Sequence, residues 1–215
     1  MTNFNLYYFF NNHHKVLVDD YFLPSFHKHN KVGINLIGVN LSENTSISYF
    51  GTNAFKNLMI ERVSKILNLI ETDEKGKKFI VSDSDIQFFS DIYPTILNVS
   101  NENYDIVFQK ETKTEGVNFG FTLISSNQNS FDFFKRILDV LTNPSTDSTM
   151  NDQTIGNKFL DIINYSTFDE SFWNWSQQFL KKDIKLHHAN CVTILDEKIS
   201  QLNFVKDFVS NRDEK

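Results

Sequence analysis

Apolar and polar positions along this chain form blocks that predict strands alternating with helices. Residues 6–10 and 33–41 are apolar runs that predict buried strands, and the second is nearly continuous in apolar character, as in a central parallel strand. Between them, residues 19–29 predict a helix, with Pro24 early enough to be tolerated in its first turn. Residues 53–71 repeat apolar positions at helical spacing, which predicts a long amphipathic helix.

A third apolar run begins at Phe79, so the chain opens in the order strand, helix, strand, helix, strand. This order predicts an α/β fold with an open, mostly parallel sheet and helices on both faces. In such a sheet, ligands bind beyond the carboxyl ends of the strands. A chain of 215 residues can bury about 70% of its unfolded surface, which fits a single domain.

The remaining sequence predicts shorter elements and contains no internal repeat. We expect strands over residues 105–109, 118–124 and 184–188, helices over 131–141, 152–163 and 197–209, and an irregular aromatic segment over 165–175. Polar residues at 11–14 and 144–151 predict a turn and a loop.

The most informative motif stands where the third strand ends. Asp83 and Asp85 are one residue apart, and strand geometry would point both carboxylates to one side and Ser84 away. Two carboxylates that close repel each other unless a cation lies between them, and a hard ion such as Mg²⁺ or Mn²⁺, shared with a phosphorylated substrate, is the usual solution. Such a triplet also arises in solvated turns, but apolar residues on both sides place this one at the edge of a core.

Composition and charge narrow the classes of partner. The net charge is −6 and no basic stripe is present, so the chain lacks the electrostatic footprint of a nucleic-acid-binding protein. The single Cys191 excludes an internal disulfide, and no stretch is apolar enough for a membrane span. Without a signal-peptide pattern at the first residues, we expect a cytoplasmic location.

The order of these pieces resembles the nucleotide-diphospho-sugar transferase family, which contains glycosyltransferases of the GT-A fold. Four local matches occur in the family's order: Asp83-Ser84-Asp85, Asn118-Phe119-Gly120-Phe121, Asp152-Gln153, and His188-Ala189-Asn190 followed by Lys198. The resemblance covers most of the chain. It implies one GT-A domain over residues 1–215 with a Rossmann-like sheet, a nucleotide-sugar-binding half over about residues 1–90 and an acceptor half over about 91–215.

The resemblance also implies roles for these residues. Asp85 would bind the metal directly, Asp83 would bind it or hold the ribose and a metal-bound water, and His188 would be the third ligand, which suits Mn²⁺ better than Mg²⁺. The implied donor-binding residues are Asp83, Ser84, Asn118, Gly120, Asn190 and Lys198. Lys198 would contact the diphosphate, and the backbone near Gly120 would approach the sugar. The implied catalytic residues, Asp152 and Gln153, would face the sugar and the acceptor.

Structural alternatives exist for several of these residues. His187 is adjacent to His188 and stays open as the alternative ligand, and a histidine after an apolar strand is often only hydrogen-bonded. Asp152 is suited to be the N-cap of its helix, and the Asn118 side chain is suited to hydrogen-bond a neighbouring backbone group. A lysine such as Lys198 on an amphipathic helix is usually exposed to solvent. His13 and His14 follow the first strand at the ligand-facing end but resemble surface residues.

One departure from the family pattern weakens the assignments of His188 and Lys198. The family often has a glycine between its histidine and its lysine. This chain has the run Cys191-Val192-Thr193-Ile194-Leu195 there. Without that glycine, the loop is expected to approach the diphosphate less closely.

The activity implied is metal-dependent transfer of a sugar from a nucleoside diphosphate, most often UDP, to the hydroxyl of a carbohydrate or protein acceptor. The His188 and Lys198 pairing favours retention of the anomeric configuration, whereas inversion would need a carboxylate base, for which Asp152 is the candidate. Two other hypotheses are a phosphohydrolase of the haloacid dehalogenase type, with the first Asp as nucleophile, and a non-catalytic nucleotide-sugar-binding protein. The sequence leaves the donor sugar, the acceptor and the oligomeric state open.

Overall fold

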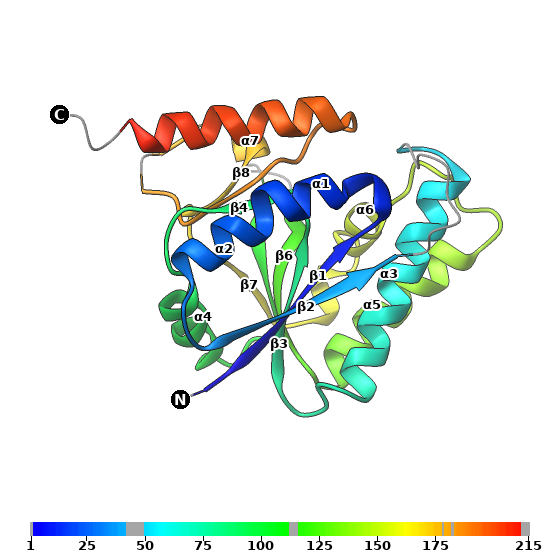
Figure 1. Ribbon diagram of the computed structural model, residues 1–215. Helices are drawn as coiled ribbons and strands as arrows, with labels where there is room; N and C mark the ends of the chain where they lie inside the picture. The colour runs from blue at the N-terminus through cyan, green and yellow to red at the C-terminus, as the bar shows by residue number, and fades with distance from the viewer. Residues whose placement is uncertain (1, 42–49, 112–115, 178, 182, 212–215) are drawn as a thin grey trace.

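A six-stranded mixed sheet forms the centre of the computed structural model, which describes residues 2–41, 50–111, 116–177, 179–181 and 183–211. In spatial order the strands are β2 (Ile34–Asn40), β1 (Phe4–Phe10), β3 (Lys78–Asp83), β6 (Val117–Ser125), β5 (Ile106–Lys110) and β7 (Tyr165–Thr167) (Figure 1). Strand β6 is antiparallel to both of its neighbours, and the other pairs are parallel. The predicted mostly parallel α/β sheet is therefore confirmed.

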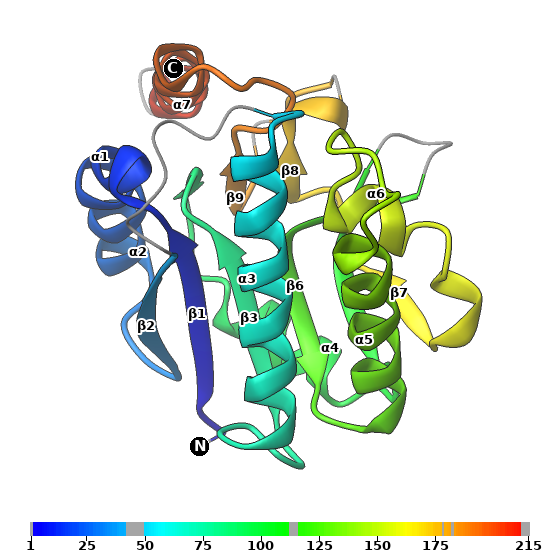
Figure 2. The same cartoon turned by 90° about the vertical axis from the view of Figure 1, so that its right-hand side faces the viewer.

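Two long helices cover one face of this sheet. They are α3 (Asn53–Glu71) and α5 (Gln128–Thr142), which lie side by side in front of the strands in Figure 2. Their apolar side chains pack on those of β1, β3, β5 and β6 in one large buried cluster. The amphipathic pattern of residues 53–71 thus identified a helix that packs on the sheet with one face.

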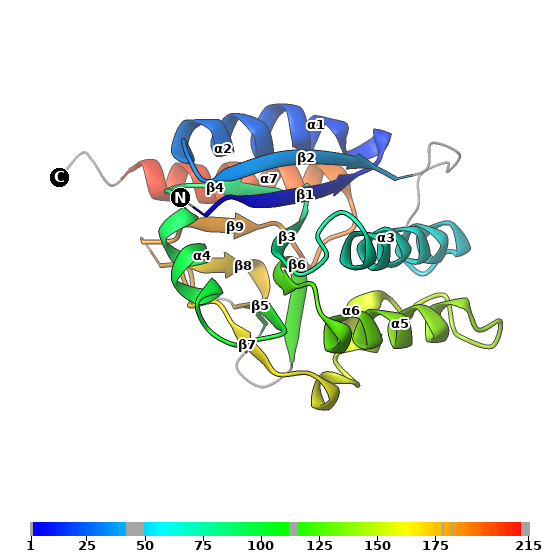
Figure 3. The same cartoon turned by 90° about the horizontal axis from the view of Figure 1, so that it is seen from below.

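The opposite face carries shorter helices and a second sheet. The helices are α1 (Lys15–Leu17), α2 (Leu23–His29) and α4 (Tyr93–Ser100), and the second sheet has the order β4 (Ile86–Phe88), β9 (Leu186–His188) and β8 (Phe172–Asn174). Figure 3 shows the two groups of helices on opposite sides of the central strands. A second apolar cluster, which contains Phe22, Ile80 and Phe121, fills this side.

The remaining elements are mostly single turns. Helix α6 (Asp152–Gly156) lies beside β6, and α7 (Leu195–Ser210) lies across the second sheet (Figure 1). The single turns are η1 (Asn12–His14), η2 (Val18–Phe22), η3 (Leu160–Ile162) and η4 (Trp175–Gln177). Within the described ranges, no helix combines the length and apolar character needed to cross a lipid bilayer.

The structure corrects three expectations about elements and adds a helix that the sequence analysis did not predict. The helix predicted over 152–163 ends at Gly156, and a separate turn follows at 160–162, because the Asn157 side chain bonds to the β6 backbone at Val117. Strand β2 is at the edge of the sheet rather than its centre. The aromatic segment 165–175 contains β7 and β8, and α4 is an additional helix.

Strand register brings the ligand-facing ends together at one edge. Asp83, the last residue of β3, lies opposite Phe9 of β1, and Gln109 of β5 lies opposite Asn118 of β6. Because β6 is antiparallel, its first residues meet the carboxyl ends of β1, β3 and β5 there. This edge is where the sequence places its candidate ligand-binding side chains.

Candidate functional site

A cavity of about 510 Å³ opens at this edge of the sheet. Every residue that the sequence assigns to the site lines it: Asp83, Ser84, Asp85, Asn118, Gly120, Asp152, Gln153, His188, Asn190 and Lys198. These residues come from β3, β6, α6, β9 and α7 and from the loops beside them, which are far apart in the sequence. The structure thus brings together in one cavity the four motifs that carry the family resemblance.

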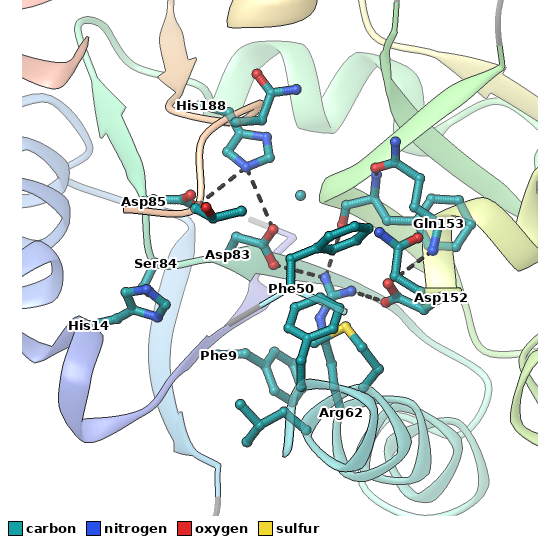
Figure 4. Close-up of a pocket in the computed structure, with 18 of the residues that line it drawn as sticks. Phe9, His14, Phe50, Arg62, Asp83, Ser84, Asp85, Asp152, Gln153 and His188 are labelled. Atoms are coloured by element: carbon teal, nitrogen blue, oxygen red, sulfur yellow. Dashed lines mark hydrogen bonds and ion pairs between the residues drawn. The ribbon is translucent and has the colours of Figure 1, made fainter. Parts of the chain in front are cut away.

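Asp83, Asp85 and His188, which all line the cavity, point toward one another (Figure 4). His188 Nε2 lies 3.3 Å from Asp85 Oδ1 and 3.6 Å from Asp83 Oδ2. One ligand atom from each of the three residues lies within 4.8 Å of the other two. The motif therefore presents both carboxylates to a single place. Strand β3 ends at Asp83, so a bend at residues 84–85 rather than continued strand geometry brings Asp85 there, and Ser84, which was expected to point away, also lines the cavity.

The other ring nitrogen of His188 faces two amide oxygens. His188 Nδ1 lies 3.1 Å from both Gln109 Oε1 and Asn118 Oδ1. Two acceptors at Nδ1 require a proton on that nitrogen, so in the neutral ring the lone pair is on Nε2. That lone pair is directed at the Asp83 and Asp85 oxygens.

With the ring neutral, three acceptor atoms face one another here, and they repel unless a cation lies among them. Two carboxylate oxygens and one imidazole nitrogen form a donor set that suits Mn²⁺, and carboxylates alone would suit Mg²⁺. The hydrogen bonds at His188 Nδ1 supply the support that a metal-binding imidazole normally has. The residues therefore fit a divalent cation.

Lys198 and Arg62 balance the charge of the two carboxylates. Lys198 Nζ donates to Asp85 Oδ2 and, at 3.0 Å, to the Ala189 carbonyl. Although burial opposes ionisation, the Lys198 ammonium holds the pKa of Asp85 well below its usual range. Burial raises the pKa of Asp83, with the Arg62 guanidinium opposing and the Asp85 carboxylate adding to the shift.

Sequence reasoning missed Arg62, which lies on α3 beneath the cavity and is 5% exposed. Its guanidinium pairs with Asp152 Oδ2, lies 3.0 Å from Asp83 Oδ1, and donates to the Phe119 carbonyl at 3.0 Å (Figure 4). A signal was present, because Arg62 falls between Leu58 and Ile66 on the apolar stripe of its helix. A charged residue in such a stripe indicates a buried partner.

Helix α6 holds Asp152 and Gln153 against β6. Its N-cap is Asn151, whose side chain accepts from Thr154 N at 2.7 Å, so the N-cap role considered for Asp152 is wrong. Gln153 Oε1 accepts from Phe119 N at 3.2 Å. Strand β3 pairs with β6 only from Phe121 onward. Before that residue, side chains of α6 hydrogen-bond to the β6 backbone in place of β3.

The missing side chain of Gly120 makes room for the imidazole of His188. A Cβ at Gly120 would lie 2.1 Å from His188 Cε1 and 2.4 Å from Nδ1. Gly120 N also donates to Asn118 Oδ1 at 2.8 Å, which fixes the direction of that amide. Close approach to a sugar by this backbone stays a prediction.

The loop between β9 and α7 turns without the glycine that the family often has. Cys191 has a φ of 66°, the left-handed conformation that glycine usually supplies, and among the described residues it is the one non-glycine with positive φ. Asn190 Oδ1 accepts from Trp175 N at 2.8 Å and holds the start of the loop. The turn then places Lys198 beside Asp85.

The two adjacent histidines of β9 point in opposite directions. His187 is 0% exposed, and its ring lies 4.9 Å from that of Trp173. It is not among the residues that line the cavity, so the candidate ligand is His188. His14 does line the cavity and is half-buried, and burial lowers its pKa to about 4.

Most of the chain matches a known protein family. Residues 12–202 match the family described as nucleotide-diphospho-sugar transferase. No curated protein is significantly similar to the chain in sequence.

Solved structures with a similar fold include three described as glycosyltransferases or as a galactosyltransferase. GlyE of Streptococcus pneumoniae TIGR4 has a TM-score of 0.62 at 11% identity, over 98% of this chain and 64% of GlyE. The glycosyltransferase involved in glycosylation of the PBCV-1 major capsid has a TM-score of 0.65 at 13% identity, over 94% of this chain and 99% of that enzyme. The galactosyltransferase LgtC, solved with donor and acceptor sugar analogues, has a TM-score of 0.63 at 10% identity, over 96% of this chain and 95% of LgtC. At these identities the likeness concerns the fold, and this chain spans less than two thirds of GlyE.

Proposed function

Because this chain belongs to the nucleotide-diphospho-sugar transferase family, we propose that it transfers a sugar from a nucleoside diphosphate to an acceptor hydroxyl, with a divalent cation at Asp83, Asp85 and His188. The observation that carries the proposal is the position of His188 Nε2, which faces the two carboxylates at 3.3 and 3.6 Å. A cation bound by all three groups would remove the repulsion among them. We take Mn²⁺ as the ion because one ligand is an imidazole.

In this proposal Asp83, Asp85 and His188 would hold the cation, and Lys198 would contact the diphosphate. When bound, the cation supplies Lewis-acid stabilisation of the negative charge on the departing diphosphate. Lys198 adds a positive point charge from the first turn of α7, once its Nζ exchanges Asp85 for phosphate oxygens. Asn118, Gly120, Ser84 and Asn190 complete the donor site, and UDP is the proposed nucleotide.

The contacts of Asp152 favour retention of configuration. An inverting reaction would need this carboxylate as a base. Its Oδ2 is paired with Arg62 and its Oδ1 accepts from Gln153 N at 2.9 Å, so it is poorly placed to take a proton. We therefore propose that the leaving phosphate accepts the proton of the acceptor hydroxyl, with Asp152 and Gln153 facing the sugar.

The two halves of the chain would have different roles in binding the substrates. Residues 1–90 would form the nucleotide-sugar-binding half and residues 91–215 the acceptor half. The second half would also contribute donor-site residues: Asn118, Gly120, His188, Asn190 and Lys198. Apolar side chains on the α3 side of the cavity include Phe9, Phe50, Phe55 and Met59. They provide a surface for the flat or apolar part of a substrate, whether nucleobase or sugar face.

The phosphohydrolase alternative finds no support in this arrangement. It would use Asp83 as a nucleophile on the first strand of the sheet. Asp83 is at the end of β3, the third strand along the chain. Its Oδ1 is held by Arg62 at 3.0 Å.

Thermal-shift binding tests the proposed donor site. We expect UDP to stabilise the protein only with Mn²⁺, and GDP to do so less. At a concentration 100 times Kd, a ligand adds about 2.7 kcal/mol, or roughly 5 to 10 °C in Tm for a domain of this size. Asp85→Ala should abolish the shift, and the isosteric Asp85→Asn should do the same if the alanine variant folds poorly.

Asp132→Ala is the matched control, because this exposed carboxylate lies on the outer side of α5. It should shift like the wild type. Turnover by Asp85→Ala should fall about 10²-fold to 10³-fold. Nucleotide binding without turnover would indicate the non-catalytic binding protein, and normal turnover in Asp85→Ala would disprove the metal mechanism.

A further inference from the structure

We propose that Gln109 is a positioning residue that aims His188 Nε2 at the cation, and this inference rests on the proposed function. Gln109 lies on β5, is 0% exposed, and places Oε1 3.1 Å from His188 Nδ1. It is not among the residues that line the cavity. It therefore acts on a bound ligand only through the imidazole.

A bulge in the sheet aims the Gln109 side chain at His188. The pairing of β5 with β6 shifts register between Phe108 and Gln109: Phe108 lies opposite Thr122, whereas Gln109 lies opposite Asn118. Bulges of this kind redirect one side chain and are common beside active sites. Here the shift puts the two amides that contact His188 on facing residues of neighbouring strands.

Backbone carbonyls of β8 fix the direction of the Gln109 amide. Gln109 Nε2 lies 3.3 Å from the Phe172 carbonyl and 3.5 Å from the Trp173 carbonyl. Carbonyl oxygens accept only, so the NH₂ group must face them and Oε1 must face the histidine. Asn118 is oriented independently, because its Oδ1 accepts from Gly120 N.

Gln109 and Asn118 together select the tautomer with the proton on Nδ1. If Gln109 is replaced by a side chain without an acceptor, one of the two oxygens that hold this proton is lost and the ring is freer to turn. Partners of this kind typically contribute about 10-fold to 100-fold to metal affinity. Gln109→Met keeps the size of the side chain and removes all three of its hydrogen bonds.

The test is calorimetric titration of the metal-free protein with Mn²⁺ alone. Gln109→Met should weaken Mn²⁺ binding by about 10-fold or more. Gln87→Met is the matched control, because Gln87 is also a buried glutamine, but it lies beside His187 in the second sheet rather than beside His188. The control should bind Mn²⁺ as the wild type does.

A double-mutant cycle separates positioning from general damage to the site. Once His188→Ala has removed the imidazole, adding Gln109→Met should weaken Mn²⁺ binding no further. A further loss in that background, or wild-type affinity in Gln109→Met alone, would overturn the proposal for Gln109 while the metal site stands. Failure of the wild type to bind Mn²⁺ would instead overturn the metal site, and this inference with it.

Discussion

Arg62 shows how one buried cation organises an acidic cavity. It joins α3 to Asp83 on β3, to Asp152 on α6 and to the backbone of β6. A buried ion pair costs desolvation on both sides, and the removal of one partner leaves the other charge unpaired inside the protein. The position of Asp152 in the cavity therefore depends on a residue some 90 positions away in the chain.

Replacing Arg62 by methionine tests this role. We expect the free energy of unfolding to fall by about 3 to 5 kcal/mol, because two carboxylates lose their partner. Urea unfolding at neutral pH measures the change. Arg136→Met is the control, since Arg136 is exposed on α5 and lies over the Phe159 ring; equal stability of the two variants would contradict the prediction.

The site residues differ in how far sequence could predict them. Asp83, Asp85 and their apolar flanks indicated a cation site from the pattern alone, and both carboxylates do meet. The role of Arg62 could not be assigned, although its place in an apolar stripe signalled a buried partner. Gln109 gave no signal, because its position depends on a register shift between two strands.

At the scale of elements, strand β9 separates two neighbouring histidines by the alternation of its side chains. His188 turns to the cavity, and His187 turns to the side where Trp173 and α7 pack. Burial lowers the pKa of His187 to about 3. Neither ring nitrogen of His187 has a hydrogen-bond partner among the described residues.

This burial predicts an acid-sensitive fold. Between pH 6.5 and about 3 the unfolded state binds the proton at His187 and the folded state does not. The contribution of His187 to stability is therefore intact above pH 6.5 and is lost as the pH falls through that window. His187→Phe should show a smaller loss of stability between about pH 7.5 and 4.5 in urea unfolding without metal, and an identical loss in both proteins would refute the assignment.

For the whole molecule, stability is unevenly distributed. Helix α3 buries seven side chains on the central sheet, of which six are apolar. Helix α7 is nearly as long but buries three, one of which is Gln201. Gln201 Oε1, Gln87 Oε1 and Trp173 Nε1 all lack hydrogen-bond partners among the described residues, and each such buried group lowers the free energy of unfolding.

Hydrogen exchange should reflect this difference. We expect backbone amides of α7 to exchange about 10-fold or more faster than those of α5, a helix of similar length on the main core, because local opening follows local packing. Mass spectrometry of peptic peptides measures both helices in one sample. Equal protection of α5 and α7 would show that α7 is part of the main cooperative unit.

Sequence by itself determined the class of fold and identified the pair of carboxylates in the cavity. The order of apolar runs predicted a mostly parallel sheet, and the spacing of residues 53–71 predicted its long helix, because burial of one face leaves a periodic pattern in the chain. The carboxylate pair after a buried strand likewise predicted a cation site, because two negative charges this close repel each other unless a positive charge lies between them.

Only the tertiary structure decided which partners meet. It selected His188 over His187, gave the N-cap of α6 to Asn151, moved β2 to the sheet edge, and brought Arg62 and Gln109 to the site. Each of these outcomes depends on contacts between residues far apart in the chain, or on strand register and sheet order. Periodicity reports that a side chain is buried, but the partner that satisfies it is set by the packing of distant segments.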